Sequence, residues 1–398
     1  MATSAEQIRA YKGPALFSLG LRPFFLLGAI WSAIAVPLWI VTYALEPDAL
    51  PVEAGLDFHV HEMTFGYGGA IVAGFLLTAV PNWTGRLPVC GGPLVALVAL
   101  WIAGRAVMLF QPGPVWLPGA IESAFLVSFA GLIWREVIAG KNTRNLKVAA
   151  AVSALAIANM AFHWTSVMSG GMPQIAIRTG LAALLFLILL IGGRITPSFT
   201  RNWLGKRGGA MPAPAGRYDS VVLIVSLAAL AGWAVTEGTP IASVLLVAAG
   251  LLNLARLARW QVQRTLAEPL VTILHAGYAW AAVALLLLGF SGLFAEVIPR
   301  VAGVHAVGAG AIGVMTLAVM TRATLGHTGL ELHAGWATVL IYVLVNLGAL
   351  MRVAAAFQEA AIQTQTNIVA GAAWSAAFVT FAVVYGPRLI SPRSSRSL

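Results

Sequence analysis

The stretch Leu270–Ser291 reads LVTILHAGYAWAAVALLLLGFS and contains no charged side chain in 22 residues. A helix of about 20 apolar residues crosses the hydrocarbon core of a bilayer, which is about 30 Å thick. Similar runs fill the chain, because 59% of its 398 residues are hydrophobic, 10% are charged, and the mean hydropathy is +0.86. So few ionic side chains cannot cover a water-facing surface. The composition therefore excludes a soluble protein and predicts a polytopic, all-α membrane protein.

The apolar runs are separated by short clusters of Gly, Pro and charged residues, and they predict twelve transmembrane helices. The helices are expected at Phe24–Leu45, Phe58–Val80, Pro93–Phe110, Leu117–Ile138, Leu146–Met168, Ile175–Ile195, Ser220–Thr236, Ile241–Trp260, Leu270–Ser291, Val301–Arg322, Gly335–Arg352 and Thr366–Tyr385. Residues 1–398 are thus interpreted as a single integral membrane domain. Residues 1–20 are its N-terminal tail, and the basic residues 201–219 form a loop between two six-helix halves.

The basic side chains divide unevenly between the two sets of alternate gaps. One set contains 20 of the 24 Lys and Arg residues, whereas the other contains Arg105, Arg178, Arg300 and Arg352. Because cytoplasmic loops carry an excess of Lys and Arg, both termini are predicted to be cytoplasmic, together with the tail and the 201–219 loop. This topology also accounts for the net charge of +10 without a nucleic-acid partner.

Cys90 is the only cysteine in the chain. A disulfide, a CxxC redox pair, a covalently attached haem, an iron–sulfur cluster and a thiolate metal cage are therefore excluded within one chain. A redox metal in this protein would have to be held by histidine.

The predicted topology sorts the seven histidines into two layers. The first layer lies about 6 to 7 Å inside the outer boundary, and its members are His59, His61, His163 and His305. His275 is expected about 7 Å from the cytoplasmic end of its helix, with His327 and His333 in a cytoplasmic connection. Imidazole suits copper, zinc and haem iron, so the outer layer is a candidate site for a haem and a three-histidine copper. The alternatives are zinc without redox chemistry, a single metal, or simple hydrogen bonds between helices.

Two carboxyl groups, those of Glu62 and Glu122, are expected at the depth of the outer histidine layer. There they would carry protons to a metal-bound substrate; the alternative is that Glu62 orients a neighbouring histidine. Three of the outer arginines, Arg105, Arg300 and Arg352, are expected to bind haem propionates. The alternative for them is a salt bridge to an acidic residue, for which the candidates are Glu237, Glu296 and Glu359.

Several segments, spread over nearly the whole chain, resemble the NnrS family. They are Leu21–Phe25, His59–Met63, Gly74–Gly85, the pair Asn159 and His163, Gly192–Pro197, Leu274–His275 with Tyr278 and Trp280, His305, and Leu325–Gly329. One departure is Leu330, where the family pattern favours an arginine. The resemblance implies a twelve-helix protein of the bacterial inner membrane that contains haem and copper and is tied to nitric oxide and nitrosative stress.

The resemblance also implies which histidines bind metal, namely His59, His61, His163, His275, His305 and His327. The cofactors expected from it are haem b and copper, and the expected ligand or substrate is nitric oxide. Reduction of nitric oxide to N2O would draw electrons from quinol or a separate donor protein. We expect His305 or His163 on an outer haem, the remaining outer histidines on copper, and His275 with His327 at a separate inner site.

Two other functions stay open at the level of the sequence. One is a non-catalytic haem protein that senses or sequesters nitric oxide. The other is a polytopic transporter, which is suggested by the number of helices alone. Turnover of nitric oxide in the presence of a reductant separates the enzyme from the sensor.

The excess of Lys and Arg in one set of gaps makes a direct prediction about topology. A reporter that is active only in the periplasm should be silent when fused after Leu398, because the C-terminus is predicted to be cytoplasmic. The same reporter inserted between Phe110 and Leu117, in a predicted outer gap, is the positive control. Activity of the fusion after Leu398 would contradict the topology and the depths derived from it.

Overall fold

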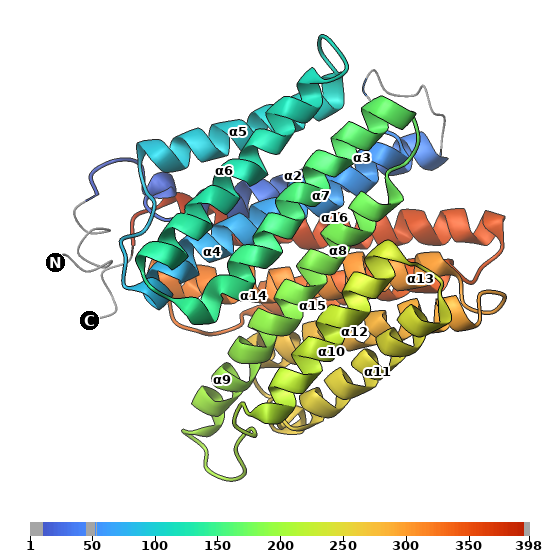
Figure 1. Ribbon diagram of the computed structural model, residues 1–398. Helices are drawn as coiled ribbons and strands as arrows, with labels where there is room; N and C mark the ends of the chain where they lie inside the picture. The colour runs from blue at the N-terminus through green and yellow to red at the C-terminus, as the bar shows by residue number, and fades with distance from the viewer. Residues whose placement is uncertain (1–10, 45–51, 53, 394–398) are drawn as a thin grey trace. The chain divides into compact units, whose positions relative to one another are not determined.

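The computed structural model describes residues 11–44, 52 and 54–393, and these residues form helices and no strand (Figure 1). Twelve helices, three of them composite, are long and apolar enough to cross a membrane, as the sequence predicts. They are α2 (Leu21–Ala44), α3 (Leu56–His61) with α4 (Gly68–Thr84), α5 (Gly92–Phe110), α6 (Leu117–Ala139), α7 (Leu146–Ser169), α8 (Gln174–Leu187) with α9 (Gly193–Leu204), α10 (Arg217–Val235), α11 (Pro240–Ala258), α12 (Pro269–Leu293), α13 (Arg300–His305) with α14 (Val314–Thr328), α15 (Trp336–Ala355) and α16 (Ala360–Ile390). Of the predicted tail, residues 1–10 lie outside the described residues, and Ala15–Phe17 forms the short 3-10 helix η1.

Each composite span contains a π-helical segment: η2 (Glu62–Tyr67), η4 (Ile188–Gly192) and η6 (Ala306–Gly313). π-Helical turns are rare and occur frequently at functional sites. Here η2 begins directly after His61 and η6 directly after His305. The two histidines therefore occupy the same local position, at the end of an α-helix where the backbone widens into a π turn.

Several helices extend beyond their predicted ends. The sixth span continues to Leu204 and the tenth to Thr328, so Arg201, Arg322 and His327 lie on helices. The placement of His327 in a connection was therefore wrong, and the loop after the sixth span is confined to residues 205–216. The prediction ended these two helices where their apolar runs end. Long basic side chains extend along a helix toward water, so a helix continues past the end of its apolar run.

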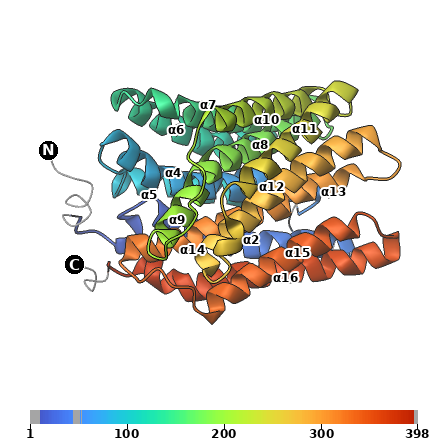
Figure 2. The same cartoon turned by 90° about the horizontal axis from the view of Figure 1, so that it is seen from below.

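The helices form two compact units. The first unit comprises residues 1–183, 323–331 and 378–398, and the second comprises residues 184–322 and 332–377. In the first unit α6 packs against α5, α7 and α4, and α4 also packs against α2 (Figure 1). In the second unit α11 lies between α10 and α12, and α12 also packs against η6 (Figure 2).

Both units bury aromatic side chains, and apolar side chains also lie on the surface. Phe24 and Phe125 pack with ring centroids 5.6 Å apart in the first unit, and Trp260 and Tyr278 at 4.6 Å in the second. On α10 the exposed residues include Val221, Ile224 and Leu227 at helical spacing. An apolar outer face of this kind suits lipid rather than water. The chain is therefore a multi-pass membrane protein.

The first and last helices of the chain meet at one end of the first unit. Arg22, in the first turn of α2, is buried, and its Nη1 donates hydrogen bonds to the carbonyl oxygens of Leu389 (2.9 Å) and Ser391 (2.7 Å). These carbonyls belong to the end of α16, where backbone acceptors have no partner within the helix. The start of the first span and the end of the last therefore lie on the same side of the membrane, as an even number of spans requires.

Close packing of α12 on α11 leads to a stability prediction. A Cβ added at Gly289 would lie 2.7 Å from the Ser243 carbonyl oxygen and 2.8 Å from the Val247 amide nitrogen. Because both are backbone atoms, Gly289→Ala should force the helices apart and cost about 1 to 3 kcal/mol, measured as a lower unfolding temperature in detergent. Gly131→Ala is the matched control, since nothing lies within 4 Å of its added Cβ, and it should be neutral or stabilising. Equal effects of the two changes would contradict this packing.

Candidate functional site

The π segment η2 places Glu62 and Gly66 at a buried junction of the first unit. A π turn displaces the helical register, so a carbonyl in it needs a partner from outside the helix in an apolar interior. The Trp101 indole, from α5, supplies one by donating a hydrogen bond to the Gly66 carbonyl oxygen at 2.9 Å. Gly66 also has no space for a side chain, because an added Cβ would lie 2.1 Å from Arg105 Nη1. The glycine thus lets the Arg105 guanidinium lie directly against the π turn.

Three charged side chains meet at this junction: Glu62, Arg105 and Glu122. Arg105 Nε lies 3.1 Å from Glu62 Oε2, and Arg105 Nη2 lies 2.5 Å from Glu122 Oε1. Both carboxylates are completely buried, and the Arg105 side chain is 5% exposed. The Trp31 indole adds a hydrogen bond to Glu62 Oε2 at 2.6 Å. Glu62, Arg105 and Glu122, with His61, are called the ion cluster below.

His61 lies within the ion cluster and has an acceptor near each ring nitrogen. Its Nδ1 is 2.9 Å from Glu62 Oε1, and its Nε2 is 3.1 Å from Asn159 Oδ1 and 3.6 Å from Glu122 Oε1. One guanidinium faces two carboxylates, so the cluster is neutral when it holds one further proton, on His61 or on a carboxyl group. Glu62 therefore lies in position both to orient the His61 ring and to share a proton with it.

His163, on α7, lies beside His61 with the two ring centroids 4.8 Å apart. Its Nε2 is buried, and no hydrogen-bond partner for it occurs among residues 11–44, 52 and 54–393. Gly119 lets α6 approach the histidine closely, because an added Cβ would lie 2.7 Å from His163 Cβ. Buried polar atoms are almost always satisfied in folded proteins, so an unsatisfied imidazole nitrogen calls for an explanation.

The other predicted site residue of this region, His59, is half-buried on α3 and stacks on Trp39 with centroids 4.2 Å apart. His327, also in the first unit, is exposed in the last turn of α14. The structure thus brings His61, His163, Glu62 and Glu122 together in the first unit. Metal binding by His59 and by His327 stays a prediction.

Two predicted ligands belong to the second unit, His275 on α12 and His305 at the end of α13. Their Nδ1 atoms lie 3.1 Å from the Val271 carbonyl oxygen and 2.9 Å from the Val301 carbonyl oxygen, respectively. Donation from Nδ1–H to a carbonyl leaves Nε2 as the basic nitrogen in the neutral ring. His275 is buried, and its Nε2 lies 3.3 Å from Thr200 Oγ1.

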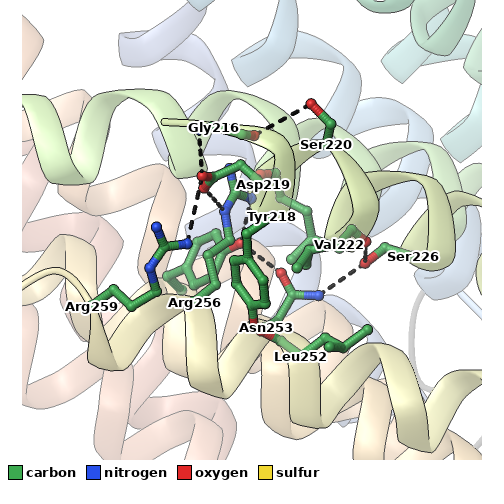
Figure 3. A network of polar contacts seen from close by, with 12 residues as sticks. Gly216, Tyr218, Asp219, Ser220, Val222, Ser226, Leu252, Asn253, Arg256 and Arg259 are labelled. Atoms are coloured by element: carbon green, nitrogen blue, oxygen red, sulfur yellow. Dashed lines mark hydrogen bonds and ion pairs between the residues drawn. The ribbon is translucent and has the colours of Figure 1, made fainter. Parts of the chain in front are cut away.

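A second buried charge pair, which the sequence analysis missed, joins Asp219 of α10 to Arg256 of α11 (Figure 3). Arg256 Nε donates to Asp219 Oδ1 at 2.7 Å, and Arg256 Nη1 donates to the Tyr278 hydroxyl at 2.8 Å and to the Leu189 carbonyl at 3.1 Å. Since Leu189 belongs to η4, Arg256 satisfies a π-turn carbonyl as Trp101 does in the first unit. The prediction had grouped Arg256 with the cytoplasmic basic residues. The available signal was Arg256 inside a helix that otherwise reads as apolar, since Asp219 fell in the predicted loop.

The outer arginines differ in their surroundings. Arg105 is enclosed by the two carboxylates, and Arg300 Nη1 lies 3.7 Å from Glu237 Oε2, one of the salt bridges expected as the alternative. Arg352 is half-buried in the last turn of α15. Propionate binding by these three residues stays a prediction.

No group of three or more His, Cys, Asp or Glu side chains in the part of the chain that the structure describes is arranged to hold a metal ion. Cys90 is half-buried between spans, and burial raises the pKa of its thiol, which disfavours the thiolate that metals bind.

The helices, the apolar outer surface and the ion cluster beside His163 define a class: polytopic α-helical membrane proteins with an ionisable site inside the bundle. Within this class the chain belongs to the NnrS family, because the NnrS protein family matches residues 15–393, nearly its whole length. Membership fits a membrane protein related to nitric oxide. A search of the curated proteins finds no match.

The ion cluster predicts that loss of the buried Arg105 destabilises the protein much more than loss of the exposed Arg135. Arg105→Met leaves two buried carboxylates without their cation and should cost about 3 to 5 kcal/mol, seen as a lower unfolding temperature in detergent. Arg135→Met is the control: Arg135 also pairs with a glutamate, Glu136, but is 59% exposed, so its loss should cost about 1 kcal/mol or less. Adding Glu122→Gln to Arg105→Met should restore part of the loss. Similar effects of the two arginine changes would show that the cluster is not buried.

Proposed function

We propose that this protein holds haem and copper through histidines within the membrane, binds nitric oxide and reduces it to N2O. Family membership supports the connection with nitric oxide. The observation that carries the proposal is His163, whose buried Nε2 lacks a hydrogen-bond partner among the described residues and lies beside His61. A coordinated metal would satisfy this nitrogen.

The donor groups present suit the two cofactors. His163 offers a buried imidazole nitrogen without a hydrogen-bond partner among the described residues, and imidazole suits copper. His61 beside it would become a second ligand by exchanging its contact with Glu62 or Asn159 for the metal. His305 and His275 each direct Nδ1 at a backbone carbonyl, the arrangement that orients a ligating histidine. We therefore assign copper to His163 with its neighbour His61 and haem b to His305, whereas His275 would belong to the separate inner site. Bound haem iron and copper supply a place for nitric oxide and a route for electrons.

The ion cluster contributes proton handling. Reduction of two nitric oxide molecules to N2O and water consumes two electrons and two protons. Glu62, Glu122 and His61 share a buried site that is neutral with one additional proton, so they can hold a proton beside His163 and release it there. Arg105 keeps both carboxylates in place within the apolar interior. The electrons come from a quinol or a separate protein donor.

The test combines metal analysis, an optical spectrum and nitric oxide consumption by the purified protein with a chemical reductant. Wild type should contain haem b and copper and consume nitric oxide, whereas His163→Ala should lose copper and consumption while keeping its unfolding temperature within a few degrees. His333→Ala, at an exposed position on the connection before α15, is the control and should retain both. Binding of nitric oxide without consumption would favour a sensor. Full copper content in His163→Ala would refute the assignment.

A further inference from the structure

A cavity of about 340 Å³ lies in the first unit, outside the candidate functional site. It is formed where the end of α14 and the residues after it meet the end of α16. Its lining includes Thr328 and Leu330 from the first segment and Val384, Arg388 and Ser391 from the second. The cavity therefore combines apolar side chains, a guanidinium and two hydroxyl groups.

The electrostatic character of this cavity is positive. Residues 324–331 and 384–393 contain two arginines, Arg388 and Arg393, and one acidic residue, Glu331, so the segments that form the cavity carry a net positive charge. Arg388 is exposed, and no acidic side chain in the described part of the chain pairs with it. Arg22 lies close by and donates to the Leu389 and Ser391 carbonyls, so it adds a second fixed positive charge beneath the cavity.

The two hydroxyl groups in the cavity wall donate to backbone carbonyls and are therefore not available as donors to a bound anion. Thr328 Oγ1 donates to the Thr324 carbonyl at 2.7 Å, and Ser391 Oγ donates to the Pro387 carbonyl at 2.6 Å. Because each hydroxyl has a single proton, neither has a second one for a ligand. Arg388 is then the donor in the cavity wall that remains for an anion.

The apolar part of the wall continues onto the outer surface of α16. Val379, Val383 and Val384 are 50%, 68% and 37% exposed, and they follow one another at helical spacing on the way to Arg388. A ligand in the cavity therefore has a charged position at the helix end and an apolar track along the helix. This combination matches a phospholipid, with its phosphate at the membrane boundary and its acyl chain along the span.

We propose that this cavity is a binding site for an anionic phospholipid, whose phosphate is held by Arg388 and whose acyl chain lies along Val384 and Val383. Basic pockets between transmembrane helices recognise anionic headgroups in this way. The site is at the membrane face to which the excess of Lys and Arg is assigned, where the first and last spans also meet. Lipid bound here joins α14 and α16 at their ends.

The test measures the unfolding temperature and the bound lipid, by native mass spectrometry, of the full chain in mild detergent. Phosphatidylglycerol should bind and stabilise more than phosphatidylcholine. Arg388→Gln should weaken phosphatidylglycerol binding about fivefold and remove the preference. Arg217→Gln is the matched control, since Arg217 is an exposed arginine at the start of α10 that does not line the cavity.

Two further measurements test where the ligand binds and whether its acyl chain is needed. Val384→Trp, which fills the mouth of the cavity and changes no charge, should also weaken phosphatidylglycerol binding. Inorganic phosphate alone should not stabilise the protein. An unchanged lipid preference in Arg388→Gln, unchanged binding by Val384→Trp, or equal stabilisation by inorganic phosphate would each overturn the proposal.

Discussion

The burial of Arg105 between Glu62 and Glu122 is the constraint on which the first unit depends. Charges inside an apolar bundle are tolerated only when each has a partner at close range. Several local features follow from holding them together: the absence of a side chain at Gly66, the close approach of α5 and α6, and the indole of Trp31 turned toward Glu62. His61 takes its orientation from the same carboxylates. A site for proton chemistry and the packing of four helices thus share one set of contacts.

The π-helical segments are a second feature that the two units have in common. Each interrupts a long span and shifts the helical register, so that side chains on either side of it face new neighbours. The carbonyls that this shift exposes are paired with side-chain donors, Trp101 for Gly66 in the first unit and Arg256 for Leu189 in the second. His61 and His305 stand at equivalent positions before η2 and η6.

Arginine side chains make contacts at the ends of the spans as well as in their interior. Arg22 ties the start of α2 to the end of α16, and Arg388 lies beside that junction without an acidic partner among the described residues. Basic side chains therefore have two kinds of role in this chain. Buried ones, such as Arg105 and Arg256, satisfy carboxylates and a π-turn carbonyl, whereas others, such as Arg388, are exposed at the ends of helices.

The sequence by itself determined the number of spans and the family, and it predicted a common depth for Glu62, Glu122, His61 and His163. Depth is a local property, because each helical residue advances about 1.5 Å from a boundary marked by polar residues. Only the tertiary structure decided which of these groups meet, that Arg105 is their counter-ion, and that Asp219 pairs with Arg256. The direction in which a side chain faces depends on the packing of neighbouring helices and on the register shift of a π turn. Neither is encoded in hydropathy or spacing, so the partners became visible only in the folded chain.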